Sequence, residues 1–159
     1  FFALSHGVNY GKLKAGKKDE RETFISDLLN LFPNINYNIL GVSNENPKWN
    51  YNFYEELIKS KMALNLSRGL PLKYTSSNRI AALIGNGIYT FVDKKTKFND
   101  FFNYNEVGFY KDVNDLGNKI EFFLSNPSKI NEFGKNGKKK YFKLFNNVNI
   151  AKNIINRTF

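Results

Sequence analysis

The sequence predicts an α/β fold in which helices cover both faces of a mostly parallel sheet. Short apolar runs alternate along the chain with segments of helical periodicity. These runs are almost continuously apolar, as expected of strands that are buried on both faces. The 159 residues and the 42% hydrophobic content are enough for one domain with its own core. We therefore expect a single Rossmann-like, three-layer α/β/α domain over residues 1–159, with about five strands and C-terminal helices.

The first half of the chain contains three of these apolar runs, separated by two helical patterns. The predicted strands are residues 1–5, 35–42 and 62–67. A helix is predicted over residues 19–32, because Phe24, Leu28 and Leu31 recur at helical spacing. Acidic residues in its first turn suit the helix dipole. A second, shorter helix is predicted over residues 52–61.

The second half begins with the remaining strands and ends in helices. The predicted strands are residues 88–93 and 107–111. A short helix over residues 78–87 precedes the first of them, with Gly85 or Gly87 as its C-terminal glycine. Residues 113–159 are predicted to be helical in three segments. Pro127 suits the first position of the middle segment, where its missing N–H costs nothing.

The composition excludes several classes of site. The chain has no Cys, which excludes disulfides, thiolate metal sites and Cys nucleophiles. The single histidine, His6, cannot form a His-rich metal site alone. No apolar run approaches the length of a transmembrane helix, and no basic stretch precedes the opening FFALSHG as in a signal peptide. We therefore expect a cytoplasmic protein. Because the chain lacks an initiator Met and opens on a strand pattern, we expect a fragment with sequence missing upstream.

The chain is strongly basic, with 24 Lys and Arg, 14 Asp and Glu and a net charge of +10. Such a charge suits nucleic acid, a membrane surface or an anionic small molecule. Specific recognition of bases and phosphates favours Arg, but only four residues are arginines: Arg21, Arg68, Arg79 and Arg157. The high content of Lys, Asn, Ile, Phe and Tyr also fits AT-rich coding. Nucleic acid is therefore not the favoured partner.

The loop after the first predicted strand, HGVNYGKLKAGKK, is rich in glycine and lysine. Glycines let the backbone approach a phosphate closely, and lysines supply positive charge. The spacing of Gly7, Gly11 and Gly16 matches neither GxGxxG nor the Walker A loop, so a dehydrogenase or P-loop NTPase is poorly supported. An ordinary exposed loop with solvated lysines is the alternative.

The loop after the third predicted strand leads into the short helix through SRGLPLKYTSSNR. Free N–H groups at a helix N-terminus bind anions, and Ser76, Ser77 and Asn78 can cap that end or donate to a ligand. Arg79 is expected near the same end. The alternative is plain N-capping by Ser77 or Asn78 beside a surface arginine.

The segment RGLPLKYTSSNRIAALIGNGIYTFVD resembles the C-terminal, donor-binding half of GT-B glycosyltransferases. That family has a loop with glycine and proline, a short helix, a small residue, a glycine and a buried strand. The likeness continues through EVGFYKDVNDLGNKIEFFLSNPSKINEFGKNGKKKYFKLFN, which is similar to the family's tail. The most similar subset is the bacterial group 1 glycosyl transferases related to spore-maturation, capsule and lipopolysaccharide enzymes. The resemblance covers essentially the whole chain and depends on the order of several weak motifs.

The resemblance implies a site for a nucleotide-sugar donor. The family holds the donor diphosphate with the loop after its first strand, and the distal phosphate and sugar with the loop before the short helix. The corresponding residues are Asn9, Gly11, Lys12 and Lys14 in the first loop, and Arg68, Tyr74, Ser77, Asn78 and Arg79 in the second. Cations and helix N–H groups suit the stabilisation of a departing nucleoside diphosphate. No metal or other cofactor is expected.

One position departs from the family pattern. Many relatives carry a Glu in the short helix that holds the nucleotide ribose, and Ala82 stands there in this chain. Since Ala cannot accept a hydrogen bond, ribose binding is expected to be weaker, supplied from elsewhere or lost. The acceptor-binding half, which often supplies the catalytic base, would lie upstream. No catalytic residue is assigned, because a lone histidine such as His6 at a strand end is more often structural.

The function that the resemblance implies is transfer of a sugar from a nucleotide-diphosphate sugar to an envelope glycan or lipid-linked acceptor. The isolated chain is expected to be inactive. Two alternatives remain. One is a nucleotide-binding module that has lost catalysis, which Ala82 favours, and the other is a basic nucleic-acid-binding protein. The lysines of GKNGKKKYFKLF are expected to form a solvated face, with Tyr141, Phe142 and Phe145 packed inward. Contact of these lysines with anionic lipid at the inner membrane face is a further expectation.

Overall fold

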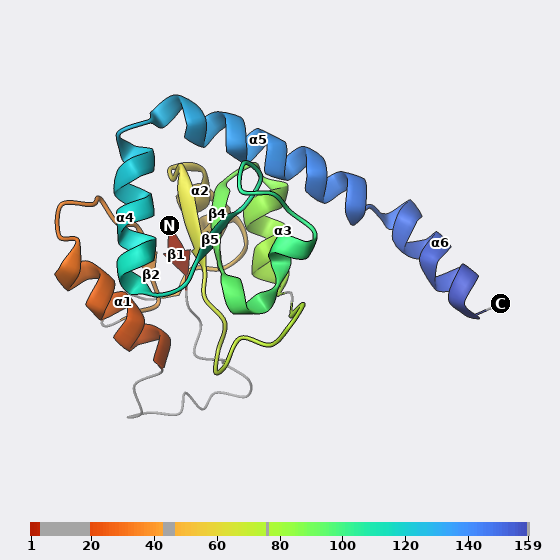
Figure 1. The fold of residues 1–159 in the computed structure, drawn as a ribbon, viewed down its shortest axis with the longest axis horizontal. Coiled ribbons are helices and arrows are strands. Elements are labelled where there is room, and N and C mark those ends of the chain that lie inside the picture. Colours follow the sequence, from red (N-terminus) through yellow and green to blue (C-terminus); the bar gives the residue numbers. More distant parts are fainter. Residues whose placement is uncertain (4–19, 43–46, 76, 159) are drawn as a thin grey trace.

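The computed structural model describes residues 1–3, 20–42, 47–75 and 77–158 and shows a mixed α/β fold (Figure 1). In chain order its strands are β1 (Phe2–Ala3), β2 (Ile39–Leu40), β3 (Met62–Asn65), β4 (Tyr89–Asp93) and β5 (Gly108–Tyr110). Its α-helices are α1 (Glu20–Leu31), α2 (Asn50–Ile58), α3 (Asn78–Gly85), α4 (Val113–Leu124), α5 (Pro127–Leu144) and α6 (Asn147–Thr158). Two 3-10 turns, η1 (Lys94–Thr96) and η2 (Phe98–Asp100), follow β4. Each of the five predicted apolar runs contains a strand.

The described strands are all parallel and form two sheets, β1-β2 and β3-β4-β5. Two backbone hydrogen bonds connect them: the Phe1 nitrogen donates to the Met62 carbonyl at 2.8 Å, and the Leu64 N–H donates to the Phe1 carbonyl at 2.9 Å. The strands therefore follow one another in the order β2-β1-β3-β4-β5. The prediction of one sheet of about five strands is corrected here. Because β1 has only two residues, it forms no regular hydrogen-bonded ladder with β3, and the two sheets stay separate.

The chain adds β2 on one side of β1 and adds β3, β4 and β5 on the other, so the order in which strands are added reverses between β1 and β3. In open parallel sheets of this kind, ligands bind outside the carboxyl ends of the strands at such a reversal. The segments that meet there are the loop after β3, the start of α1 and the start of α3. The fold thus directs attention to the same β3–α3 connection that the sequence analysis singled out.

Helices cover both faces of the strands, with α1 and α4 on one side and α3 on the other, and α5 crosses the domain from α4 to α3 (Figure 1). On the first face, Phe91 and Tyr110 pack with Leu28 of α1 and Phe123 of α4. The second face has a separate cluster that includes Val92 and the α3 residues Ile80 and Ile84. The three-layer α/β/α arrangement that the apolar runs predict is therefore present.

The turn after α3 contains the predicted C-terminal glycine. Gly87 has a φ of +79°, which favours glycine, and its N–H donates to the Ile84 carbonyl at 2.9 Å. The Ile88 N–H reaches back to the Leu83 carbonyl at 3.2 Å. Gly87 rather than Gly85 is the glycine that ends this helix.

The C-terminal helices differ in part from expectation. Tyr141 is half-buried and packs against the second core cluster, but the Phe142 side chain is 51% exposed. Adjacent residues of an α-helix point about 100° apart, so Phe142 cannot share the inward face of Tyr141. Phe145 is also exposed, although its ring centroid lies 5.1 Å from that of Tyr141. The prediction that all three rings pack inward is therefore wrong for Phe142. It holds in part for Phe145, whose ring centroid also lies 6.4 Å from that of the buried Phe102.

The last helix, α6, contributes nothing to the described core. It has no buried residue and extends away from the layers of the domain (Figure 1). Within the described residues, no helix combines the length and the apolar character that crossing a membrane requires.

Candidate active site

A hydrogen-bonded polar pair joins β3 to the start of α3. Asn65, at the carboxyl end of β3, is only 4% exposed, and the Ser77 hydroxyl donates to its Oδ1 at 3.2 Å. Ser77 occupies the N-cap position of α3 with an extended backbone. Its side chain makes no capping hydrogen bond within the described part of the chain. The hydroxyl of Ser77 therefore fixes the helix start against the strand instead of capping the helix.

Arg79 lies in the first turn of α3 and turns back over the sheet. Its Nη1 donates to the Leu66 carbonyl at 3.3 Å, and its guanidinium carbon lies 5.6 Å from the centroid of the Phe2 ring. Burial, and to a lesser extent the positive charge of Arg21, lowers the pKa of Arg79 to about 10. Arg79 is still a cation at neutral pH. It is half-buried between β1 and β3 and is not the surface arginine of the alternative interpretation.

Arg21 provides a second guanidinium near this edge, and the sequence analysis did not include it in the site. It is 5% exposed, in the first turn of α1. Arg21 shares the buried stripe of that helix with Ile25 and Leu28. A charged residue at i relative to apolar residues at i+4 and i+7 is the signal that could have identified it.

A cavity of about 230 Å³ opens beside these groups, between α1 and the carboxyl ends of β3, β4 and β5. Its lining residues are Glu20, Arg21, Phe24, Leu66, Ser67, Gly69, Pro71, Asp93 and Tyr110. The Gly69 N–H donates to the Glu20 carboxylate across its mouth. Gly69 has a φ of +68°, which lets the loop after β3 turn toward α1. Strand ends, a charged helix start and a glycine turn thus surround one recess, with both polar and apolar lining residues, at the edge where ligands are expected.

A family model described as glycosyl transferase-like matches residues 20–156. The chain belongs to this family. The matched range includes Arg21, Arg79, the loop after β3 and all of α3, and it supports a glycosyltransferase domain of the group 1 type. A search of curated proteins and a search of solved structures found no match to the chain.

The remaining predicted site residues of this glycosyl transferase-like domain are placed differently. Arg68 and Asn78 are exposed, on the loop after β3 and at the first position of α3. The Tyr74 hydroxyl donates to Asp100 Oδ2 at 2.7 Å, and its ring lies edge-on to Phe101 at 5.0 Å. Tyr74 therefore ties the loop to η2, and its hydroxyl is not directed to Arg79.

The predicted residues of the first loop lie outside the described residues. They are Asn9, Gly11, Lys12 and Lys14, together with His6. Their part in donor binding remains a prediction. In the part of the chain that the structure describes, no group of three or more His, Cys, Asp and Glu side chains could hold a metal ion.

Ala82 lies half-buried in the middle of α3. Its carbonyl accepts a hydrogen bond from Asn86 Nδ2 at 2.6 Å. The helix, NRIAALIG, has no acidic residue, so no carboxylate on α3 replaces the Glu of many glycosyltransferase relatives.

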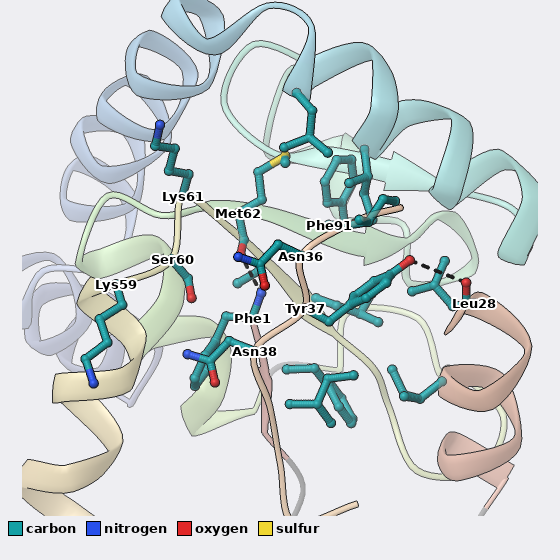
Figure 2. A pocket seen from close by; sticks show the side chains of 18 residues that line it. Phe1, Leu28, Asn36, Tyr37, Asn38, Lys59, Ser60, Lys61, Met62 and Phe91 are labelled. Atoms are coloured by element: carbon teal, nitrogen blue, oxygen red, sulfur yellow. Dashed lines mark hydrogen bonds between the residues drawn. The ribbon is translucent and has the colours of Figure 1, made fainter. Parts of the chain in front are cut away.

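A larger cavity of about 450 Å³ lies at the opposite edge of the sheet (Figure 2). It is bordered by the residues before β2 and β3, including Asn36, Asn38 and Lys61, and by apolar side chains such as Phe91. The Tyr37 hydroxyl in its wall donates to the Leu28 carbonyl at 3.3 Å. Because it is at the amino ends of the strands, this cavity is not where parallel sheets bind their ligands.

Proposed function

We propose that this domain binds the nucleotide-diphosphate sugar donor of a glycosyltransferase. The observation that carries the proposal is the pair of guanidinium groups, Arg21 and Arg79, at the carboxyl edge between α1, β1 and β3. Burial, and to a lesser extent the positive charge of Arg21, lowers the pKa of Arg79. An anion bound at this edge would stabilise the guanidinium cation of Arg79. A diphosphate has the negative charge and the pairs of oxygens that guanidinium groups bind well.

The chemical task of such a site is to stabilise the departing nucleoside diphosphate. Negative charge grows on the diphosphate as the bond to the sugar breaks, and preorganised cations and N–H groups stabilise that charge. We assign this role to Arg79, Ser77 and Asn78 at the start of α3 and to Arg68 nearby. Asn9, Gly11, Lys12 and Lys14 of the first loop are proposed to complete the diphosphate site, and Tyr74 is proposed to shape it by anchoring its loop. No metal is needed in this scheme.

The acceptor side of the reaction is proposed to lie upstream. We propose that an acceptor-binding domain supplies the catalytic base and that the acceptor is an envelope glycan or a lipid-linked sugar. A cytoplasmic protein at the inner membrane face would fit such an acceptor. The exposed lysines of α5 support peripheral contact with anionic lipid, because basic clusters are attracted to such surfaces. These lysines include Lys135, Lys138, Lys139 and Lys143.

A second candidate function is a donor-binding module without catalysis. Ala82 favours it, since α3 carries no group to accept a hydrogen bond from the ribose. Restoring the acidic residue with Ala82→Glu separates the candidates. A rise in nucleoside diphosphate affinity in this variant would indicate a site that has decayed, whereas unchanged affinity would indicate a ribose held by other residues.

The first experiment is a calorimetric titration of the chain with UDP, GDP, ADP and CMP at moderate salt. We expect saturable binding of one of them. Arg79→Ala should weaken that binding by about 2 kcal/mol, or roughly 30-fold, the usual effect of removing a hydrogen-bonding charge. A folded protein that binds none of the four would overturn the proposal.

The matched control is Arg157→Ala. Arg157 is exposed in the last turn of α6, far from the sheet edge, so this variant loses the same charge without touching the site. Equal losses in both variants would mean nonspecific attraction to a basic protein. Oligonucleotide binding with a steep dependence on salt would instead support the nucleic-acid alternative.

A further inference from the structure

The Tyr110 hydroxyl is a buried polar group beside the cavity of about 230 Å³. Tyr110 ends β5, is 1% exposed, and its hydroxyl makes no hydrogen bond within the described chain. Buried tyrosines normally satisfy this group, as Tyr89 does by donating to the Tyr104 carbonyl at 2.8 Å. An unsatisfied hydroxyl beside a cavity therefore requires an explanation, and a bound ligand is one.

Tyr110 is held next to an acidic side chain. Asp93, the last residue of β4, is its partner in the parallel register, so both side chains lie on the α1–α4 face of the sheet. Burial raises the pKa of the Tyr110 hydroxyl, and the Asp93 charge raises it further. The hydroxyl thus stays protonated and can donate. Asp93 Oδ1 accepts from the Lys95 N–H at 2.7 Å, and within the described residues no side-chain bond to its Oδ2 is found, so that oxygen can accept from a ligand.

The cavity in front of Tyr110 combines polar groups of both kinds with an aromatic wall. Phe24 of α1 also lines it, with its ring centroid 5.7 Å from that of Tyr110. Ser67 adds a hydroxyl from the loop after β3, and Arg21 and Asp93 add a donor and an acceptor. A volume of about 230 Å³ is below that of typical pockets for drug-sized ligands and suits a single ring.

We infer that this cavity binds the sugar ring of the donor and that the Tyr110 hydroxyl donates to one of its hydroxyl groups. Every sugar hydroxyl both donates and accepts, which matches a recess with Tyr110, Ser67 and Asp93 in reach. The apolar side of the ring would lie against Phe24. The inference rests on the proposed function, because the diphosphate at Arg79 and Arg21 would deliver the sugar to this recess.

Other occupants fit the recess less well. A phosphate group would meet the carboxylates of Glu20 and Asp93, which repel it. An apolar group would leave the Tyr110 hydroxyl unsatisfied and would cover a buried guanidinium. Water alone would satisfy Tyr110, and the experiment below distinguishes it from a sugar.

The test is Tyr110→Phe, which removes the hydroxyl oxygen and keeps the ring. Affinities are measured by calorimetry for matched pairs of a nucleoside diphosphate and its sugar conjugate: UDP with UDP-glucose and UDP-N-acetylglucosamine, GDP with GDP-mannose, and ADP with ADP-glucose. We expect the variant to bind its conjugate about tenfold more weakly than the wild type, the usual effect of one lost hydrogen bond to a ligand, with unchanged affinity for the bare diphosphate.

The matched control is Tyr89→Phe. Tyr89 is a second buried tyrosine, on β4, and its hydroxyl already donates to the Tyr104 carbonyl. This control should lose thermal stability and keep both affinities, whereas Tyr110→Phe should keep its stability. Equal weakening of diphosphate and conjugate would place Tyr110 against the nucleotide and overturn the inference. Unchanged binding of both would mean that the cavity holds only water. In either result the wild type still binds the diphosphate and the proposed function stands, whereas a wild type that binds no diphosphate overturns the proposed function together with this inference.

Discussion

Gly134 of α5 lies directly against the carbonyl oxygen of Gly87, in the turn that ends α3. A Cβ atom at Gly134 would overlap that oxygen, and a Cβ atom at Gly137, one turn further along, would overlap the Glu106 carbonyl oxygen. The two glycines therefore let α5 closely approach the loop before β4 and the loop before β5. The close approach holds α3 in place, and α3 carries Ser77 and Arg79 of the candidate site.

Replacing Gly134 should therefore destabilise the domain. Although alanine is favoured over glycine by about 1 kcal/mol within a helix, overpacking against a backbone oxygen costs about 1–3 kcal/mol. We expect Gly134→Ala to lower the free energy of unfolding in urea denaturation. The control is Gly85→Ala, where a Cβ atom meets nothing within 4 Å, and this variant should be neutral or more stable. Equal stability of the two variants would show that α5 does not pack as described.

The Asn65–Ser77 hydrogen bond is expected to stabilise the start of α3. Asn65→Ala removes a buried amide and its bond to the Ser77 hydroxyl, and should lower the free energy of unfolding by about 1–3 kcal/mol. Ser77→Ala should cost less, because Ser77 is exposed. A double-mutant cycle should give a coupling of at least about 0.5 kcal/mol, and additivity of the two effects would contradict a direct bond.

The sequence predicted the position of every strand because each is a compact apolar run. It could not predict how many strands share one sheet, since this depends on ladder length, and β1 and β2 are only two residues long. The helical spacing of Phe24, Leu28 and Leu31 located α1 correctly. Leu31 is nevertheless 52% exposed, while Arg21 occupies the buried stripe.

Part of the candidate site was also predictable. Ser77 and Arg79 were identified from the polar entry to α3, and they lie at the expected edge of the sheet. The sequence analysis did not identify Asn65 and Tyr110, because a single polar side chain at the end of an apolar run gives no distinct signal. Asn65 stands out only through its hydrogen bond with Ser77, and Tyr110 only because its hydroxyl has no hydrogen-bond partner among the described residues. Both features depend on the tertiary structure.

Stability at acidic pH should depend on Glu56 of α2. Hydrogen bonds from Lys48 and Lys59 lower the pKa of this carboxyl from 4.5 to about 2 in the folded protein. Since folding lowers the pKa, the ionised form stabilises the folded state. This contribution is complete above pH 4.5 and is lost as the pH falls from 4.5 toward 2. Glu56→Gln should be less stable than the wild type at neutral pH.

Urea denaturation at several pH values between 7 and about 2.5 checks this dependence. The difference in unfolding free energy between wild type and Glu56→Gln should shrink through the acid range. Glu55→Gln is the control, because it removes the same charge at the neighbouring, exposed position of α2 and leaves the bonds of Glu56 to Lys48 and Lys59 in place. A difference for Glu56→Gln that stays constant through the acid range would show that these bonds do not persist in solution.

Removal of α6 should leave the domain folded and equally stable. The helix has no buried residue, and side chains such as Ile154 and Ile155 are more than half exposed, so its loss removes little apolar contact. We expect a chain that ends at Asn146 to unfold within about 0.5 kcal/mol of the full chain in urea, since surface changes are usually this small. A chain shortened further, to end at Phe133, would lose the half of α5 that contains Gly134 and Tyr141 and should not fold cooperatively. A marked loss of stability in the first chain would mean that α6 packs against the domain in solution.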